Sequence, residues 1–325
     1  MAVFITGGYG HIGSWMVKRF VQSGESVIVY DCKADLPDYL ERASSSIHFI
    51  CGDVLDRTHM TEVFRKQGRQ IDGIVHTVGI MGEFVAENPY DSVRLNIIGT
   101  LNLLEIARQY EIEKVLYVST GAVYGVHEGI AAEQVNPPPP ADLYAATKLS
   151  SEYLGLQYAD SFGLDFRIGR VYFIYGPGKL PSDFVRLYRV AFGALEGIPD
   201  PGADRGADQK LDFTYVDDAA RGLVMLYQAE EPKHRIYNIA TGQATSVGKI
   251  ADLSAKYAST GLRYRIGPGM LMPRCEALDI SRAEQEFGYT PEVTLDEGIR
   301  LYAAWLKYRA ADRRRSSRSA SRRNQ

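Results

Sequence analysis

Two residues near the middle of the chain could carry out acid–base chemistry together. Tyr144 and Lys148 stand four positions apart in a segment with helical periodicity, so both side chains point from one face of that helix. A phenol is a poor base at its ordinary pKa of about 10, and a neighbouring ammonium makes it a better one by stabilising the phenolate. The spacing indicates proton transfer, but such a pair is a common coincidence in a chain with 21 tyrosines. A catalytic role for the pair therefore needs support from other parts of the sequence.

A glycine-rich segment near the N-terminus could bind a phosphate. It lies between an apolar stretch at 3–6 and a helix-like pattern at 12–23, and it contains Gly8, Gly10 and Gly13 in the Gly-x-Gly-x-x-Gly spacing. Glycine permits a tight turn and close approach of a pyrophosphate, whose charge the amides at the helix N-terminus stabilise. The strand before it and the helix after it make this a predicted dinucleotide site. The loop residues expected against the cofactor are Gly7, Gly10, His11, Ile12 and Gly13.

An acidic residue at the end of the second strand-like stretch bears on the choice of cofactor. Asp31 follows Gly13 by 18 residues. A carboxylate there accepts hydrogen bonds from the adenosine ribose and repels a 2′-phosphate, which favours NAD over NADP. Lys33 leaves NADP as an alternative cofactor, since a nearby cation can accommodate the extra phosphate. NAD is the expected cofactor.

The elements that must position these residues alternate between strand-like and helix-like patterns. Expected strands lie at 3–6, 26–31, 47–51, 73–77, 115–119 and 165–171, with long helices at 90–110 and 144–162. This alternation predicts an α/β fold, a Rossmann-type doubly wound parallel sheet with helices on both faces. Beyond residue 171, Gly/Pro-rich loops alternate with helices around 183–195, 216–229, 246–258 and 295–306. We therefore expect an NAD-binding domain at 1–171, with return segments near 213–240, and a smaller C-terminal substrate-binding lobe mostly at 172–308.

Composition places the chain among ordinary globular proteins, with 45% apolar and 24% charged residues. Cys32, Cys51 and Cys275 are too few and too scattered for a disulfide framework or a zinc site, and no metal-ligand spacing surrounds His11 or His76. No signal or membrane-spanning segment is expected, so cytoplasm is the predicted location. Residues 309–325 hold seven arginines against one acid. This tail is expected to be disordered, and nucleic acid is not its expected partner because the rest of the chain is acidic.

At this point the sequence resembles the extended short-chain dehydrogenase/reductases, the NAD-dependent epimerase/dehydratase family. The matching pieces span about residues 2–305 and together are highly specific. They are Thr6-Gly7-Gly8-Tyr9-Gly10-His11-Ile12-Gly13, Gly52-Asp53-Val54, Asn96-Ile97-Ile98-Gly99-Thr100, Val118-Ser119-Thr120-Gly121-Ala122-Val123-Tyr124-Gly125, Tyr144 with Lys148, Arg170 followed by Tyr175-Gly176-Pro177-Gly178, Phe213-Thr214-Tyr215-Val216-Asp217-Asp218, and Tyr237-Asn238-Ile239.

The resemblance implies roles for individual residues. Asp53 and Val54 would flank the adenine, and Thr120 would be the catalytic hydroxyl that hydrogen-bonds the reacting oxygen. Tyr144 would remove the proton while hydride passes to the nicotinamide, and Lys148 would also hold the nicotinamide ribose. A homodimer joined by the helices at 90–110 and 144–162 is implied as well, although packing on the sheet explains their apolar content equally. Asn96 is expected to be structural.

Three departures from the family pattern bear on the substrate. Dehydratases of the family follow the catalytic threonine with an Asp-Glu pair, where this chain has Gly121 and Ala122, so elimination of water is disfavoured. Nucleotide-sugar members commonly carry Asn at the position of Phe173 and Arg at that of Leu211. Because a diphosphate needs cationic or amide donors, these replacements make a nucleotide sugar a less favoured substrate.

The candidate substrate contacts are Met81, Thr120, Phe173, Arg186 and Arg274. The leading hypothesis is an NAD-dependent oxidoreductase or epimerase that transfers hydride at a secondary alcohol carbon of a carbohydrate-like or small polyol substrate. A nucleotide-sugar 4-epimerase is the first alternative. A non-catalytic NAD-sensing protein is the second.

Overall fold

A parallel sheet with seven strands forms the centre of the chain. The computed structural model describes residues 2–67, 70–126, 128–133, 137, 139–183 and 185–323. The strand order is β3 (Ile47–Cys51), β2 (Ser26–Asp31), β1 (Ala2–Thr6), β4 (Ile71–His76), β5 (Lys114–Thr120), β7 (Asp165–Val171) and β9 (Ile236–Ile239). The order runs outward in both directions from β1, so the crossover between β1 and β4 is the place where such sheets bind ligands.

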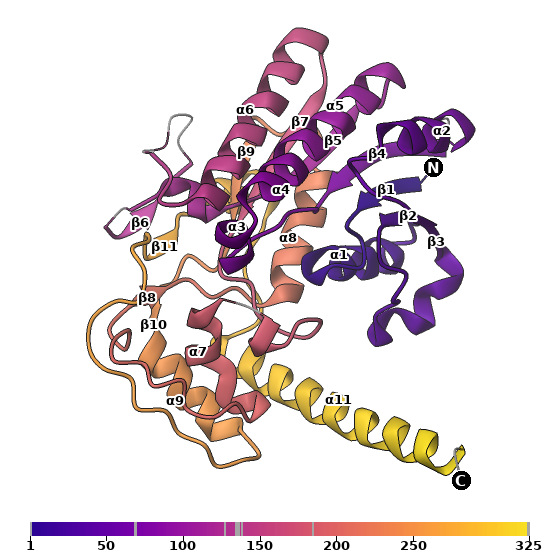
Figure 1. The fold of residues 1–325 in the computed structure, drawn as a ribbon. Helices are drawn as coiled ribbons and strands as arrows, with labels where there is room; N and C mark the ends of the chain where they lie inside the picture. The colour runs from indigo at the N-terminus through magenta and orange to yellow at the C-terminus, as the bar shows by residue number, and fades with distance from the viewer. Residues whose placement is uncertain are drawn as a thin grey trace.

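Helices cover both faces of the sheet, which confirms the predicted fold class (Figure 1). One apolar core joins the sheet to α1 (His11–Gln22), α8 (Val216–Gln228) and α10 (Ser281–Phe287). The other core joins it to α2 (Arg57–Gln67), α5 (Gly99–Gln109) and α6 (Leu143–Phe162). No helix was expected at α2, because most of its residues are polar. Its buried side chains are those of Met60, Val63 and Phe64.

The helix expected at 90–110 is interrupted. It consists of α4 (Pro89–Val93), a π-helical turn η3 (Arg94–Ile98) and α5. A regular helix would bury Val93, Ile97 and Leu101 on the same face as Leu104 and Ala107, but the first three are only partly buried. Ser92, Asn96 and Thr100 are buried instead, because the π turn adds a residue and rotates the face presented to the sheet.

A smaller lobe lies at one end of the sheet (Figure 1). Its core packs α7 (Arg186–Glu196), α9 (Val247–Tyr257) and the first part of α11 (Leu295–Arg323) around aromatic side chains. The remaining elements are short. They are η1 (Asp38–Ser46), α3 (Glu83–Glu87), η4 (Gly121–Tyr124), β6 (Ile130–Ala131), η5 (Pro181–Asp183), β8 (Lys210–Leu211), β10 (Thr245–Ser246) and β11 (Ala277–Leu278).

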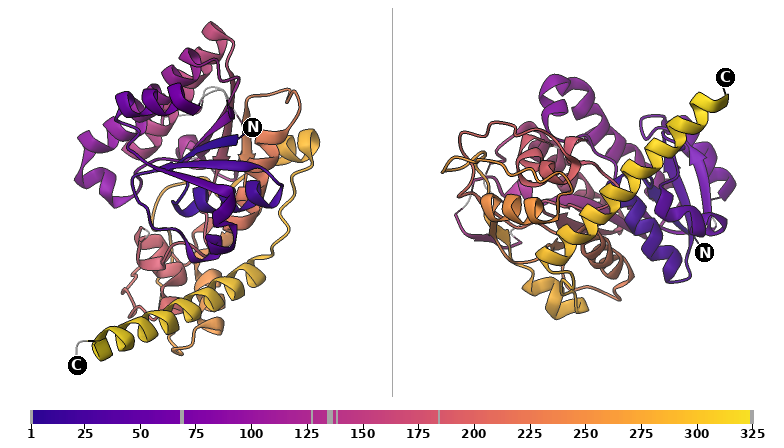
Figure 2. Two further views of the ribbon diagram at one scale, coloured as in Figure 1. Left: turned by 90° about the vertical axis from the view of Figure 1, so that its right-hand side faces the viewer. Right: turned by 90° about the horizontal axis from the view of Figure 1, so that it is seen from below.

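The last helix continues where the sequence predicted disorder. The backbone of α11 is helical through Arg323 and extends away from the body of the molecule (Figure 2). Alanine and arginine favour helix, no glycine or proline follows Gly298, and the segment only extends a helix that packing has already nucleated. Within the described residues, no helix combines the length and apolar character needed to cross a membrane.

Candidate active site

The carboxyl ends of five strands surround a cavity of about 810 Å³. Gly7 follows β1, Asp31 ends β2, Thr77 follows β4, Thr120 ends β5 and Val171 ends β7, and all of them line the cavity. The cavity continues from the glycine loop to the lobe, where Val185, Tyr188 and Met272 contribute to its wall. This is the crevice in which open parallel sheets bind ligands.

The glycine loop has the geometry that a dinucleotide requires. Gly7 has a φ of +71°, and a Cβ atom on Gly13 would lie 2.1 Å from the carbonyl oxygen of Gly7. Gly10 is the N-cap of α1, so no cap side chain covers the amides of the first turn. The residues that the sequence predicts as cofactor contacts in this loop all line the cavity: Gly7, Gly10, His11, Ile12 and Gly13. The loop therefore fits the pyrophosphate of NAD.

The adenosine end of the cavity is formed by the next two strand ends. The Asp31 carboxylate accepts hydrogen bonds from the backbone amides of Tyr9 and Lys33 at 3.0 and 3.1 Å. Asp53 and Val54 also line this region, and the Asp53 carboxylate accepts from the amide of Leu55 at 2.9 Å. Both carboxylates are thus held by backbone amides, and Asp31 is placed to accept hydrogen bonds from a ribose.

Tyr144, Lys148 and Thr120 meet on one wall of the same cavity. Asp142 is the N-cap of α6 and accepts from the amide of Ala145 at 2.8 Å, which fixes the start of the helix two residues before Tyr144. Lys148 lies one turn further along, with its Nζ 4.2 Å from the centroid of the Tyr117 ring. Tyr144 lies close enough to Thr120, at the end of β5, for the threonine hydroxyl to lower the pKa of the phenol. The three residues predicted to be catalytic are therefore neighbours.

Burial controls the protonation of this group. Loss of solvent raises the pKa of Tyr144 to about 12, and the charge of Asp142 adds to the increase while the hydrogen bond to Thr120 opposes it. Burial lowers the pKa of Lys148 to about 7, and the charge of Glu152 opposes that decrease. Lys148 can therefore change its charge close to neutral pH, which is a property of functional sites more than of structural ones.

A buried ion pair lies beneath the catalytic helix. Arg170 on β7 donates to Glu152 on α6, with Nη2 2.6 Å from Oε2 and Nε 3.0 Å from Oε1, and Ser119 Oγ donates to the same carboxylate. The Arg170 guanidinium also stacks 4.8 Å from the centroid of the Tyr124 ring. Glu152 is thereby fixed one helical turn beyond Lys148, with its acceptor capacity satisfied.

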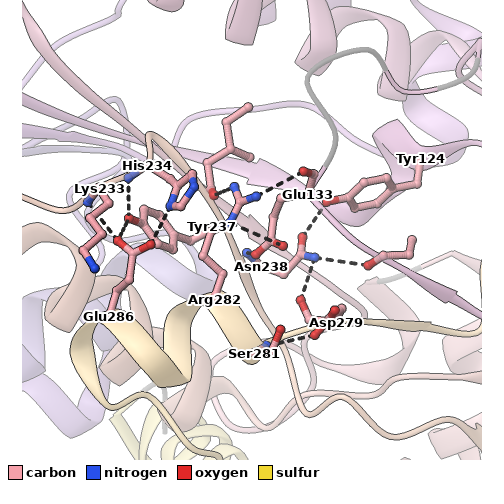
Figure 3. A network of polar contacts seen from close by, with 12 residues as sticks. Tyr124, Glu133, Lys233, His234, Tyr237, Asn238, Asp279, Ser281, Arg282 and Glu286 are labelled. Atoms are coloured by element: carbon pink, nitrogen blue, oxygen red, sulfur yellow. Dashed lines mark hydrogen bonds and ion pairs between the residues drawn. The ribbon is translucent and has the colours of Figure 1, made fainter.

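Figure 3 shows a second polar network, which is centred on Asn238 of β9. Asn238 pairs with Arg170 across β7 and β9, and its Oδ1 accepts from Tyr124 Oη at 2.8 Å. Its Nδ2 donates to the carbonyl oxygens of Asp279 and Ala131 at 2.9 and 3.2 Å. These bonds tie β9 to η4, to β6 and to the residue that follows β11.

Asn96 and His76 are buried hydrogen-bonding residues next to α6, and Asn96 Nδ2 donates to Thr147 Oγ1 of that helix at 2.9 Å. Asn96 accepts from the amide of Ile80 at 2.8 Å and donates to its carbonyl at 3.0 Å, which matches its predicted structural role. The ring of His76 is hydrogen-bonded to Thr6 Oγ1 at 2.6 Å and to Thr100 Oγ1 at 3.1 Å. Burial and the charge of Lys148 lower the pKa of His76 to about 3, so its imidazole is neutral.

The predicted substrate residues separate into two groups. Met81, Phe173 and Arg274 line the main cavity with Thr120. Arg186 does not; it lines an adjoining cavity of about 350 Å³, together with Arg205 and Leu271. The two cavities share Tyr144, Val185 and Met272 among other residues. A long substrate can therefore reach from the catalytic tyrosine toward Arg186.

Two apolar residues occupy positions that the sequence marked as departures. Phe173 has a φ of +33°, a left-handed conformation that asparagine adopts far more readily than phenylalanine. Its ring packs against Tyr172 and Phe213 at centroid distances of 4.6 and 5.3 Å. Leu211 is fully buried in the core of the lobe. Neither side chain can donate a hydrogen bond to a phosphate.

Sequence reasoning missed several residues of the site. Glu152 was not singled out, although its spacing of four from Lys148 repeats the spacing of Tyr144 and Lys148. Asp142 was also missed; it caps the catalytic helix and forms an ion pair with Arg274. Lys179 and Arg205 line the two cavities from loops that carry no periodic signal. Only Glu152 could have been identified from a regular pattern.

The fold, the glycine loop and the Tyr144–Lys148 pair define a dinucleotide-binding enzyme of the Rossmann type. Relatives make the class more specific. A model described as the NAD dependent epimerase/dehydratase family matches residues 3–240. The chain is 28% identical to a putative UDP-glucose 4-epimerase of Methanocaldococcus jannaschii, an alignment that covers 94% of this chain and 98% of that protein. It is 27% identical to a UDP-glucuronate 4-epimerase of Thermodesulfobacterium geofontis, with 93% and 95% covered.

Solved structures of similar proteins support the same family. A UDP-glucose 4-epimerase of Thermotoga maritima with UDP-glucose superposes with a TM-score of 0.84 at 26% identity, covering 95% of this chain and 100% of that one. A UDP-glucose 4-epimerase of Thermus thermophilus in complex with NAD gives 0.81 at 28% identity, with 94% and 99% covered. The chain belongs to the NAD-dependent epimerase/dehydratase family. The predicted resemblance, enzyme class and NAD dependence are confirmed, and the alternative of a non-catalytic sensor is set aside.

Proposed function

We propose that this chain is a 4-epimerase of a UDP-sugar, with Tyr144, Thr120 and Lys148 as its catalytic residues. The observation that carries the proposal is that Tyr144, Lys148 and Thr120 line the same cavity as the glycine loop. The relatives support the substrate class, since their names specify UDP-glucose and UDP-glucuronate 4-epimerases. The first alternative from the sequence thereby becomes the favoured hypothesis.

NAD bound along Gly7, Gly10, Gly13 and Asp31 supplies the hydride acceptor. Tyr144 takes the proton from the reacting hydroxyl, and Thr120 holds the same oxygen by a hydrogen bond. Lys148 lies on the Tyr144 face of α6, so its ammonium stabilises the phenolate electrostatically. Tyr144 would return the proton to the same oxygen when the cofactor gave hydride back to the opposite face of the sugar, and the product would be the epimer.

The residues beside Thr120 favour epimerisation over dehydration. Gly121 and Ala122 are buried and carry no titratable group. A Cβ atom on Gly121 would lie 2.6 Å from the ring of Tyr172, so the wall has no room for a carboxylate at that position. Removal of water from a sugar needs a general acid and a base at the adjacent carbon. The site lacks the groups that the family's dehydratases use there.

The adjoining cavity offers a place for the nucleotide part of the substrate. Arg186 and Arg205 contribute two cations there, and Leu271 and Met272 contribute apolar surface. Arginine suits recognition of a phosphate by paired donors. We propose that these residues compensate in part for the absence of donors at Phe173 and Leu211.

A second candidate is an NAD-dependent dehydrogenase that acts on a smaller carbohydrate or polyol. Phe173 and Leu211 favour it, because a substrate without a diphosphate needs no phosphate donors at those positions. The two candidates use the same catalytic residues. They differ in whether the oxidised sugar is released with reduced cofactor or is reduced again before release.

One experiment separates them. Purified protein and NAD are incubated in separate reactions with UDP-glucose, UDP-galactose, UDP-glucuronate and simple sugars. The products are identified by proton NMR, while absorbance at the NADH band is followed in parallel. Interconversion of 4-epimers without net NADH supports the proposed function. Net NADH formation with simple sugars and no epimerisation of any UDP-sugar supports the dehydrogenase and contradicts the epimerase.

We also propose the assembly and division of the chain expected from its sequence. A homodimer through 90–110 and 144–162 is supported by partly or fully exposed apolar side chains on those segments, including Tyr90, Ile98, Tyr153 and Phe162. The three scattered cysteines support a cytoplasmic location, because they form no disulfide framework. We assign residues 1–171 and the later segment 213–240 to NAD binding, and most of 172–308 to the substrate.

A further inference from the structure

Lys179 brings a cation to the phosphate end of the cavity. It lies in the loop between β7 and η5 and lines the same cavity as Gly10, His11 and Gly13. His11 is the first residue of α1. Lys179 is close enough to His11 for its charge to lower the pKa of that imidazole. The ammonium group thus lies beside the first turn of the helix that follows the glycine loop.

Contacts from two distant helices hold this loop in place. Trp15 Nε1 on α1 donates to the carbonyl oxygen of Pro177 at 2.8 Å, and Tyr302 Oη on α11 donates to that of Lys179 at 2.6 Å. Gly178 has a φ of +108°, and a Cβ atom there would lie 2.7 Å from Tyr39 Oη and 3.2 Å from His11 Cδ2. The loop is therefore pressed against α1, and the position of Lys179 is fixed by packing.

The electrostatic surroundings of Lys179 favour an anion. Burial lowers the pKa of Lys179, and Asp183 is the acid that opposes this decrease. Burial and the charge of Lys179 lower the pKa of His11 to about 3, so the imidazole carries no charge at neutral pH. The ammonium and the positive end of the α1 dipole therefore both add positive potential at this end of the cavity, which favours the binding of an anion there.

We infer that Lys179 binds the pyrophosphate of the cofactor together with the glycine loop. The inference rests on the proposed placement of NAD in the main cavity. The glycine loop supplies backbone amides to the pyrophosphate, and Lys179 supplies the charge that amides lack. Tyr302 has the role of a positioning residue, since it acts through the backbone of Lys179. The C-terminal helix is thereby connected to cofactor affinity.

Binding of three ligands tests this assignment. NAD, ADP and adenosine are titrated by calorimetry into the full-length chain and into Lys179→Met, Lys179→Arg and Tyr302→Phe. Lys249→Met, which removes an exposed lysine on α9, is the matched control. We expect Lys179→Met to weaken NAD and ADP about tenfold or more and to leave adenosine unchanged, because only the first two carry a pyrophosphate. Lys179→Arg should stay within about threefold of the wild type, and Tyr302→Phe should lie between the two.

Three outcomes would overturn the inference. If Lys179→Met binds NAD and ADP as tightly as the Lys249→Met control does, Lys179 is not a ligand of the pyrophosphate. Equal weakening of all three ligands would mean that the substitution disturbs the whole cavity. A wild-type chain that binds none of the three would instead contradict the placement of NAD itself, so failure of the two claims can be told apart.

Discussion

Glu152 and Arg170 form an ion pair in which the two side chains are 1% and 0% exposed, with 2.6 Å between Oε2 and Nη2. The pair joins α6, which carries Tyr144 and Lys148, to β7 of the central sheet. A buried charge without its partner is far more costly than an exposed one. The catalytic helix is therefore fastened to the sheet by an interaction that fails if either partner is removed.

Loss of one partner should destabilise the protein strongly. We expect Arg170→Met to lower the free energy of unfolding by about 3–5 kcal/mol, because Glu152 would remain buried and uncompensated. Arg300 and Glu297 form an exposed pair on α11, and Arg300→Met should have a much smaller effect because solvent screens that pair. Urea denaturation measures the free energy of unfolding of both variants. Equal losses in the two variants would mean that the buried pair has no special role.

Tyr144→Phe removes the proposed base and leaves the ring in place. We expect kcat to fall by at least about 100-fold, in keeping with the contribution of a positioned acid–base group, while NAD affinity stays within a few-fold. Tyr153→Phe, at an exposed position on the same helix, is the control and should keep full activity. A Tyr144→Phe variant with normal turnover would show that another group removes the proton.

The buried ammonium of Lys148 predicts a particular dependence of stability on pH. Its pKa is about 7 in the folded chain, against about 10.4 for an unfolded chain. Below pH 7 both states hold the proton, and the cost of burying the charge is present in full. Between about pH 7 and 10.4 only the unfolded chain holds it, so this cost decreases as pH rises.

Lys148→Met isolates that contribution, since methionine has similar length and no titratable group. We expect the stability of the wild type relative to Lys148→Met to increase with pH above 7, by up to about 1.4 kcal/mol per pH unit. Urea denaturation of both proteins at pH 7, 8 and 9 gives the difference. A difference that stays constant across this range would place the pKa of Lys148 elsewhere.

Phe173→Asn should improve binding of a UDP-sugar. Asparagine accepts the left-handed backbone at this position, where φ is +33°, and supplies an amide donor on the cavity wall. We expect KM for the best UDP-sugar to fall several-fold, with some loss of thermal stability because the contacts with Tyr172 and Phe213 are lost. Phe173→Ala relieves less strain and adds no donor, so it serves as the control. An unchanged or higher KM in Phe173→Asn would remove Phe173 from the substrate site.

Local patterns in the sequence were sufficient for much of the site. The glycine loop, the strand end at Asp31 and the Tyr144–Lys148 face each depend on residues close in sequence, and the structure brings them to one cavity. Other features depend on segments far apart. The pairing of Glu152 with Arg170 requires the register of α6 on β7, and the position of Lys179 requires Trp15 and Tyr302.

Two further differences arise from backbone geometry. The π turn around Asn96 rotates the buried face of the helix, and the spacing of apolar residues in the sequence could not predict that rotation. The extension of α11 beyond residue 309 depends on the packed helix before it, whereas composition alone favoured disorder.

The most direct test of hydride transfer is a reaction in D2O with the UDP-sugar that turns over fastest. Because hydride leaves and returns to the same carbon within a closed site, the epimerised product should carry no deuterium at that carbon, while its hydroxyls exchange freely. Mass spectrometry and proton NMR of the product measure this. Retention of the carbon-bound hydrogen in the wild type, together with no product from Tyr144→Phe, is the predicted result. Incorporation of one solvent deuterium per turnover at the inverted carbon would contradict the account.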